Sequence, residues 1–266
     1  MHSLSSEAAS LWRSRHLLRV LVRREVVARY TGTAAGAVWL YAQPLATLAA
    51  YFLVVDVVLG MRLGRDAPTA RVRAFLVVGA LPWMAWSDAI QRSMGSLLEA
   101  GALLQKNALP PVLFPVRAVL ASQVVYAPLL VVLVLAYAPW HGGAAALVLL
   151  PLVFLLMFVL MVLLGYVLAV LALALRDVVQ LVGFALSLGI YVTPILFPLS
   201  MVPPGVRWLL WVNPVTPVVL ACQSLLLQGQ VPPWQVWPAL LAWIVLLLVV
   251  LAVLVRRSRD QWVDWL

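Results

Sequence analysis

The sequence predicts an all-α integral membrane protein with six transmembrane helices, an N-terminal amphipathic interfacial helix, and a pair of short re-entrant helices between spans five and six. The first observation is composition: 65% of the 266 residues are hydrophobic and only 10% are charged, whereas a soluble domain carries about 25% charged residues. The second is six apolar runs of about 20 residues or more, the length that a helix needs to cross a bilayer. The third is that basic residues gather on one side of these runs. Together they predict a single transmembrane domain over residues 1–266.

The six apolar runs are the predicted spans. The second run is the least apolar, because it carries Asp88, Gln91 and Arg92. The last run is the most clearly bounded, with tryptophans before it and arginines after it. The runs cover residues 36–59, 74–94, 116–138, 144–175, 178–199 and 236–255.

Orientation follows from the basic residues, because cytoplasmic loops carry an excess of lysine and arginine. With both termini in the cytoplasm, thirteen of the 18 basic residues lie inside and five lie outside. The outer five are Arg62, Arg65, Arg71, Arg73 and Arg207. The net charge of +9 is therefore assigned to membrane flanks and anionic lipid, and no nucleic-acid partner is expected.

Residues 10–30 predict the interfacial helix. At about 100° per residue its apolar side chains fall within one arc, and a stripe of arginines occupies the neighbouring face. This stripe is either an ordinary basic flank or a contact for an anionic lipid headgroup. The apolar arc is Leu11, Leu17, Leu18, Leu21 and Val22, and the stripe is Arg15, Arg19 and Arg23.

The loop between spans two and three, 97–115, begins like a helix and is stopped by Pro110 and Pro111, which cannot continue one. A short cytoplasmic helix here could contact a soluble partner. The other interpretation is an ordinary connecting loop.

The segment from 191 to 233 is apolar but contains repeated prolines, so no uninterrupted helix can cross there. Broken backbone inside hydrocarbon must be buried in protein or line a cavity. We expect two short re-entrant helices, 205–212 and 216–228, turning at Asn213-Pro214. The alternative is an interfacial hairpin that only covers other helices.

Within the spans, Asp88 and Arg92 are spaced i, i+4, so they either neutralise each other or mark a pathway. Aromatic residues at several positions belong to the interfacial belt or line an internal path, where flat rings suit sliding sugars. The candidates for the path are Trp39, Tyr41, Tyr51, Trp83, Trp86 and Tyr126.

Catalytic and metal-binding patterns are missing from the sequence. The one lysine, Lys106, is not preceded by the glycine pattern of a P-loop, so ATP phosphates cannot be held by that route. No HExxH or GxSxG occurs, and the single Cys222 leaves no metal-binding set. We expect a protein that is not an enzyme, has no metal site, and needs a separate subunit for any ATP-driven work.

Three stretches make the chain similar to a known family. They are LVRREVVARYTGTAAGAVWLYAQPL (21–45), FLVVGALPWMAWSDAIQRSMGSLLEAGALLQKNALPPVLFPV (75–116) and TPILFPLSMVPPGVRWLLWVNPVTPVV (193–219). The chain resembles the permease subunit of ABC-2-type exporters, in the branch that exports lipid-linked polysaccharides such as O-antigen, teichoic acid or capsule. It departs from that pattern at Leu109-Pro110-Pro111, where a lysine or polar residue is more usual.

The resemblance implies a homodimer in the bacterial inner membrane, paired with two ATPase subunits that bind ATP and Mg²⁺. This chain itself would carry no cofactor. The transported substrate would be an undecaprenyl-pyrophosphate-linked polysaccharide, and the six aromatic residues would line its channel.

The resemblance also implies roles for three further sets of residues. The entrance, which meets the lipid headgroup, would be Arg15, Arg19, Arg23, Arg29 and Tyr30. The coupling helix, within 97–110, would present Leu98, Glu99, Ala102, Leu103, Gln105 and Lys106 to the ATPase. The outer gate, within 200–230, would contain Pro203, Arg207, Trp208, Trp211 and Asn213.

Three alternatives remain at this stage. The same architecture could export drugs or small lipids. The chain could instead be a membrane-embedded acyl- or glycosyltransferase, although no convergent His, Asp and Glu groups are evident. It could also be a scaffold without a pathway.

Overall fold

The structure is a computed structural model that describes residues 4–64, 66–106, 109–141 and 145–258. These residues form α-helices joined by turns and loops, and no β-strand occurs among them. The α-helices are α1 (Leu4–Arg13), α2 (Arg15–Ala28), α3 (Trp39–Phe52), α4 (Val72–Glu99), α5 (Gly101–Lys106), α6 (Leu113–Tyr137), α7 (Leu150–Ala174), α8 (Asp177–Val192), α9 (Arg207–Trp211), α10 (Thr216–Gln223) and α11 (Val236–Ser258). Short 3-10 or π turns are Gly36–Val38, Leu53–Val58, Ala138–His141, Ala145–Leu149, Leu199–Met201, Pro204–Val206 and Ser224–Gln228.

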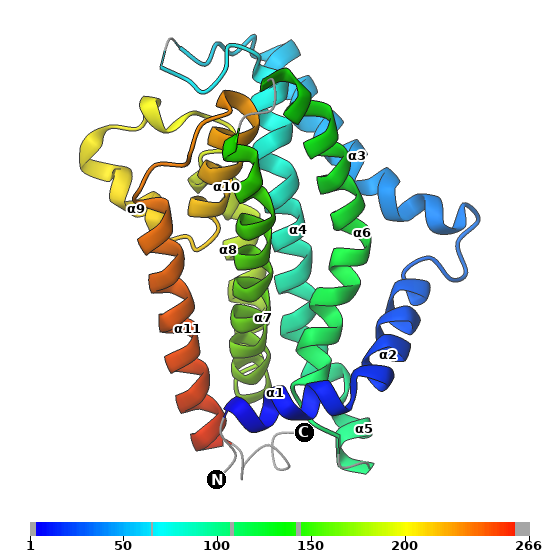
Figure 1. The fold of residues 1–266 in the computed structure, drawn as a ribbon. Helices are drawn as coiled ribbons and strands as arrows, with labels where there is room; N and C mark the ends of the chain where they lie inside the picture. Colours follow the sequence, from blue (N-terminus) through cyan, green and yellow to red (C-terminus); the bar gives the residue numbers. More distant parts are fainter. Residues whose placement is uncertain (1–3, 65, 107–108, 142–144, 259–266) are drawn as a thin grey trace.

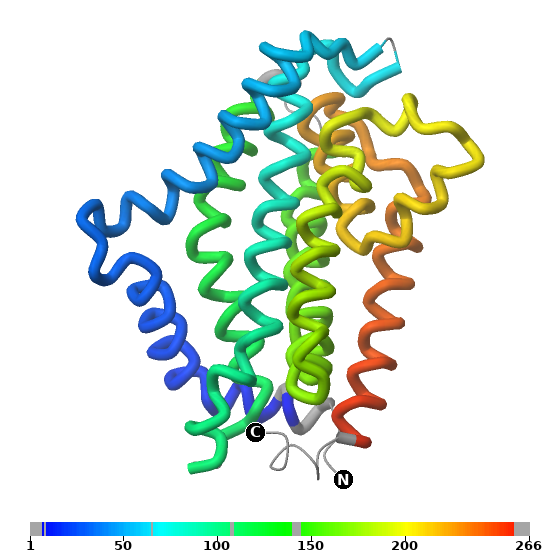
Figure 2. The backbone as a smooth tube through the Cα atoms, turned by 180° about the vertical axis from the view of Figure 1, so that it is seen from behind, coloured from blue at the N-terminus to red at the C-terminus, as the bar shows by residue number. Residues whose placement is uncertain are grey.

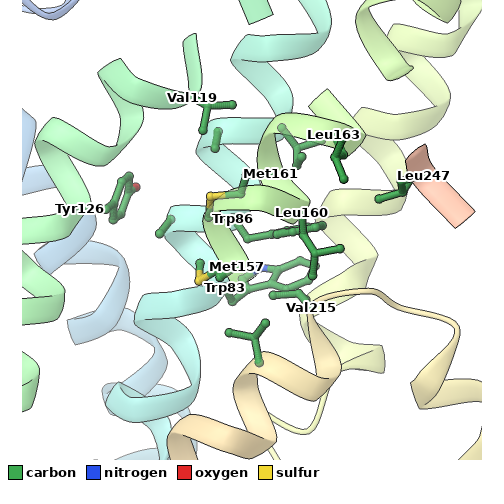
Figure 3. Close-up of a cluster of buried hydrophobic side chains, with 14 of the residues drawn as sticks. Trp83, Trp86, Val119, Tyr126, Met157, Leu160, Met161, Leu163, Val215 and Leu247 are labelled. Atoms are coloured by element: carbon green, nitrogen blue, oxygen red, sulfur yellow. The ribbon is translucent and has the colours of Figure 1, made fainter. Parts of the chain in front are cut away.

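Helices α4, α6 and α7 form the centre of the bundle (Figure 1). α4 packs along both neighbours, while α11 packs on α7 and α10 packs on α4. Figure 3 shows Trp83 and Trp86 of α4 beside Met157 and Leu160 of α7. Because lipid is as apolar as these side chains, close packing must supply much of the attraction between helices.

The bundle has two distinct ends. α1, α5 and the last turn of α11 lie at one end, which we call the α5 end, and α9 and α10 lie toward the other, the α10 end (Figure 1). The first and last described helices therefore reach the same end of the bundle.

Four helical segments are long and apolar enough to cross a membrane, and a fifth crossing would form if the bent α9–α10 pair is one span. The four correspond to predicted spans one, three, four and six. They are Val38–Val58, Leu113–Tyr137, Ala145–Ala174 and Val236–Arg257. Of the other two predicted spans, α4 is long but more polar, and α8 is apolar but has only 16 residues.

The fifth predicted run, 178–199, is helical only as far as Val192. Thr193 is extended, with φ −93° and ψ 145°, because the residue before a proline is pushed out of the helical region. Pro194 and Pro198 then keep the chain from resuming an α-helix. The predicted end of this span is thus seven residues too long.

The proline-broken segment forms two short helical pieces, close to the predicted 205–212 and 216–228. Pro204–Trp211 and Thr216–Gln228 meet at an angle of 108°. At the turn, Asn213 Nδ2 donates to Thr193 Oγ1 at 2.8 Å, which ties the turn to the end of α8. Gly229, with φ 64°, ends the second piece in the left-handed conformation that glycine adopts readily.

The predicted interfacial helix, 10–30, is two helices rather than one. It begins earlier, at Leu4, and is interrupted at Ser14 (φ −93°, ψ 14°). α1 crosses the foot of the bundle and α2 rises beside it, so that α2 and α3 meet in an elbow projecting from the side (Figures 1 and 2). Gly32 in this elbow has φ +83°, which other residues rarely adopt.

Candidate functional site

A cluster of charged and polar side chains centres on Asp88, in the middle of α4. Arg92 Nε donates to Asp88 Oδ1 at 2.8 Å, as the i, i+4 spacing predicts. On the other carboxylate oxygen, Ser122 Oγ of α6 donates at 2.7 Å and Arg29 Nη1 of the elbow donates at 3.2 Å. Asp88 therefore joins three segments of the chain.

Arg29 is the most buried cation of this cluster, with only 8% of its side chain exposed. Burial lowers the pKa of Arg29 from its ordinary value, and the charge of Asp88 offsets part of this shift. A guanidinium stays protonated in proteins, so the contact is an ion pair. Arg29 Nε and Nη2 have no hydrogen-bond partner among the described residues, which makes the pair costly to break.

A second ion pair lies nearer the α5 end. Arg117 Nε of α6 lies 2.5 Å from Glu25 Oε2 of α2, although the two atoms are not aligned as a hydrogen bond. Both side chains are mostly buried, at 16% and 17% exposure. Arg117 Nη2 also lies 3.9 Å from Glu99 at the end of α4. The two ion pairs differ in which side supplies the acid. α2 supplies the acid Glu25 to the pair with Arg117, whereas the elbow supplies the base Arg29 to the pair with Asp88.

The sequence contained a signal for these pairs that the predictions missed. At about 100° per residue, Glu25 and Arg29 fall within the arc of Leu18 and Val22, on the apolar side of the helix. A charge on an apolar face needs a buried partner. The expected set grouped Arg29 with the arginine stripe, whereas the structure turns it toward the bundle.

A cavity of about 580 Å³ separates α2 from α5 and from the ends of α4 and α6. Four arginines and two glutamates line it, together with apolar and small side chains. The charged lining residues are Arg24, Glu25, Arg29, Arg92, Glu99 and Arg117.

An aromatic groove of about 320 Å³ lies between α3, α4, α6 and α8. Three of the six predicted channel residues line it: Tyr51, Trp83 and Tyr126. Polar side chains share the lining, so the groove offers both flat rings and hydrogen-bonding groups. The polar members are Gln43, Ser87, Asp88, Gln91 and Ser187.

The other three predicted channel residues lie elsewhere. Trp86 is only 2% exposed and packs in the core on the α7 side of α4 (Figure 3). Trp39, at the start of α3, is 55% exposed, and Tyr41 is half-buried against the main core. The structure thus brings half of the aromatic set together in one groove.

The predicted entrance residues divide into two groups. Arg15, Arg19 and Arg23 are exposed along α2, and the Arg15 guanidinium lies 5.0 Å from the centre of the Trp12 ring. Tyr30, like Arg29, is partly buried in the elbow. The stripe is therefore open to lipid or to a ligand.

The predicted coupling residues span two helices. Leu98 and Glu99 end α4, and the other four lie on α5. These four are exposed at the α5 end of the molecule: Ala102, Leu103, Gln105 and Lys106. The predicted segment also includes residues 107–108, which lie outside the described residues.

The predicted outer-gate residues surround the α9 turn at the α10 end. Arg207 and Trp211 line a cavity of about 570 Å³, and Arg207 Nε donates to Val202 O at 2.8 Å. Asn213 holds the turn, as described above. Trp208 and Pro203 are exposed and face away from the core.

The described residues contain no group of three or more His, Cys, Asp or Glu side chains that could hold a metal ion. The site instead combines a charged cluster, an aromatic groove and a basic cavity along one side of a helical bundle. Such an arrangement can bind and guide a polar ligand.

The chain is similar in sequence to a family of transporters and to bacterial permeases. A family model described as ABC-2 type transporter matches residues 16–227. The O-antigen export system permease protein RfbA of Myxococcus xanthus is 28% identical over 259 residues, covering 96% of both chains. An O-antigen export system permease protein RfbA of Klebsiella pneumoniae is 24% identical over 221 residues, covering 80% of this chain and 81% of the relative.

Proposed function

Because the chain belongs to the ABC-2 type transporter family, we propose that it is the permease subunit of an O-antigen export system. The observation that carries this proposal is its similarity to an O-antigen permease over 96% of both chains. The substrate would be a polysaccharide linked to undecaprenyl pyrophosphate, moved across the bacterial inner membrane. The chain is a transport subunit, and a separate ATPase, with its ATP and Mg²⁺, would drive it.

We propose that all six predicted segments cross the membrane, with both termini cytoplasmic. α4, with 28 residues, is about 42 Å long and exceeds the roughly 30 Å hydrocarbon core. α8, with 16 residues, is about 24 Å long. Its short reach leaves room for the bent α9–α10 pair, which would enter from the outer side and return.

Three features of the structure support a division of roles: the arginine stripe on α2, the aromatic groove and the exposed residues of α5. The exposed stripe on α2 carries positive charge where a pyrophosphate headgroup would arrive. The aromatic groove offers ring faces and polar groups that suit sugars. The exposed residues of α5 offer a contact for the ATPase, and a homodimer would bind two copies of it.

The proposal is tested with the chain purified together with its ATPase and reconstituted into liposomes. ATP hydrolysis should be stimulated by lipid-linked O-antigen, and cells that lack this chain should lose surface O-antigen and regain it on complementation. Stimulation by drugs or small lipids, with no response to the lipid-linked glycan, would instead support the drug-exporter alternative. Deletion with no change in surface glycan would contradict the proposal.

A further inference from the structure

Arg117 lies between two carboxylates on separate elements. Glu25, 2.5 Å away, belongs to α2, and Glu99, 3.9 Å away, is the last residue of α4, two residues before α5 begins. Arg117 itself is in the first turns of α6, next to the centre of the bundle. One side chain therefore links the helix that carries the arginine stripe to the segment that carries the exposed coupling residues.

The two contacts differ in strength. The Glu25 contact is mostly buried, whereas Glu99 is 74% exposed and more distant. A buried pair is held firmly, because separating it leaves an uncompensated charge, while an exposed pair at this distance is weak. The guanidinium fork can meet two carboxylates at once. A small movement of Glu99 therefore changes the balance between the two contacts without unfolding either helix.

The surroundings leave room for such a movement. The cavity of about 580 Å³ is lined by Glu25, Glu99 and Arg117, and also by Ala102 and Leu103 of α5. Only Ala100 separates Glu99 from α5. A displacement of α5 toward or away from the cavity must therefore move the Glu99 carboxylate relative to Arg117.

The Arg29–Asp88 ion pair holds the C-terminal end of α2 in place. It fixes the elbow to α4 and α6 just after the last turn of α2. With that point held, a change at Glu25 tilts the remainder of α2, which carries the arginine stripe. Coupling between distant sites requires an element that can adopt two arrangements. Here that element would be α2, with Arg117 closer to Glu25 in one arrangement and closer to Glu99 in the other.

We infer that Arg117 is a positioning residue that transmits movement of α5 to α2, exchanging between Glu25 and Glu99 as the ATPase works. This inference rests on the proposed function, because it assumes that α5 contacts an ATPase and that α2 receives the substrate. It assigns a role to three residues, two of which lie outside the predicted entrance and coupling sets.

The experiment measures glycan exported per ATP hydrolysed by the reconstituted complex. Arg117→Gln should leave the ATPase bound and hydrolysing ATP, because Arg117 is not one of the predicted coupling residues. It should lower the glycan exported per ATP by about tenfold, within the usual range for coupling between sites. Arg73→Gln is the matched control. It removes an ion pair of 3.0 Å with Asp56, near the α10 end, and should leave the ratio unchanged.

A double-mutant cycle separates this role from a direct contact of Glu99 with the ATPase. If Arg117 transmits the movement, Glu99→Gln lowers the ratio in the wild type and has no further effect in Arg117→Gln. If the two losses multiply, the inference is wrong. Because Arg117→Gln leaves Glu25 buried and unpaired, Glu25→Gln/Arg117→Gln serves as a second background in which both partners are neutral.

Charge reversal gives a test in which the glycan exported per ATP should first fall and then be restored. Glu25→Arg/Arg117→Glu rebuilds the buried pair but makes residue 117 repel Glu99, so the ratio should stay low. Adding Glu99→Arg should restore it toward wild type, and failure to restore it in a folded complex would overturn the inference. A wild-type complex that exports no glycan would instead disprove the proposed function. Normal export in Arg117→Gln would disprove only the role of Arg117.

Discussion

Asp88 lies in a helix that we propose crosses the membrane, where an unpaired carboxylate would be costly. It accepts contacts from Arg29, Arg92 and Ser122, so that each carboxylate oxygen has at least one donor. Two of the three donors come from other segments. The carboxylate therefore stabilises the attachment of the elbow to the bundle, and it also accepts a hydrogen bond from Arg92 in its own helix.

Replacing Asp88 with asparagine leaves Arg29 buried without an anion. We expect Asp88→Asn to lower the free energy of unfolding by about 2–3 kcal/mol, somewhat less than the full cost of breaking a buried pair, because 20% of the Asp88 side chain is exposed. Ser122→Ala, which removes one neutral donor, should cost only about 1 kcal/mol. Thermal unfolding of the detergent-purified chain measures both, and equal losses would contradict the assignment of Arg29 to this carboxylate.

The contacts of Asp88 could be predicted from the sequence only in part. The contact with Arg92 was predictable, since i, i+4 spacing is a local property of a helix. The contact with Arg29 spans 59 residues and that with Ser122 spans 34, so both depend on how the helices pack. The position of Glu25 and Arg29 on the apolar side of the helix indicates that both face inward. It does not indicate which residues they contact, because that depends on how the helices pack.

At the scale of elements, helix ends and breaks were predictable where proline or glycine acts locally. Two short helices lie close to the predicted bounds on either side of Asn213-Pro214, because proline excludes continuation of a helix on steric grounds alone. The apolar run continues past Pro194 and so predicts the end of α8 seven residues too late, whereas Thr193 leaves the helical region because it precedes a proline. The break at Ser14 has no comparable sequence signal.

The contact between α8 and α4 depends on a glycine. A Cβ added at Gly189 would collide with the ring of Trp83, whereas one added at Gly183, on the same helix, meets nothing within 4 Å. We expect Gly189→Ala to destabilise the chain by about 1–3 kcal/mol through overpacking. Gly183→Ala should be neutral or stabilising by up to about 1 kcal/mol, the helix-propensity difference between the two residues. Thermal unfolding of the pair tests this, and a similar loss in both would show that α8 packs differently.

The arginine stripe on α2 gives a prediction about transport. Arg15, Arg19 and Arg23 are exposed, so their replacement by glutamine should leave folding and ATPase association intact. If they meet a pyrophosphate headgroup, at about 1 kcal/mol for each basic residue near an anionic surface, the triple variant should reduce surface O-antigen strongly. Replacing the exposed Arg176 alone is the control. Normal surface glycan in the triple variant would show that the arginine stripe is an ordinary basic flank of the membrane and does not contact the headgroup.

At the scale of the molecule, much apolar surface is left uncovered by the chain itself. Only 11% of the span that contains α3 is buried, and α8 exposes Leu181 and Phe184 at 67% and 65%. Lipid or a second copy of the chain can cover such faces. In the proposed homodimer, a second copy would cover part of this surface and would add protein walls, which lipid cannot provide, to a pathway for a polar chain.

The proposed topology makes a prediction about sidedness. α1 and the end of α11 lie at the same end of the bundle, and the loop after α10 lies toward the other (Figure 1). On a Cys222→Ala background, single cysteines at Ala9 and Arg257 should react with a membrane-impermeant maleimide only after the inner membrane is opened. A cysteine at Val231, which is 63% exposed, should react in spheroplasts with intact membranes. Six crossings require this labelling pattern, because each crossing reverses the side of the membrane and an even number returns the chain to the cytoplasm. If α9–α10 were instead a full span, the cysteines at positions 9 and 257 would be labelled from opposite sides of the membrane.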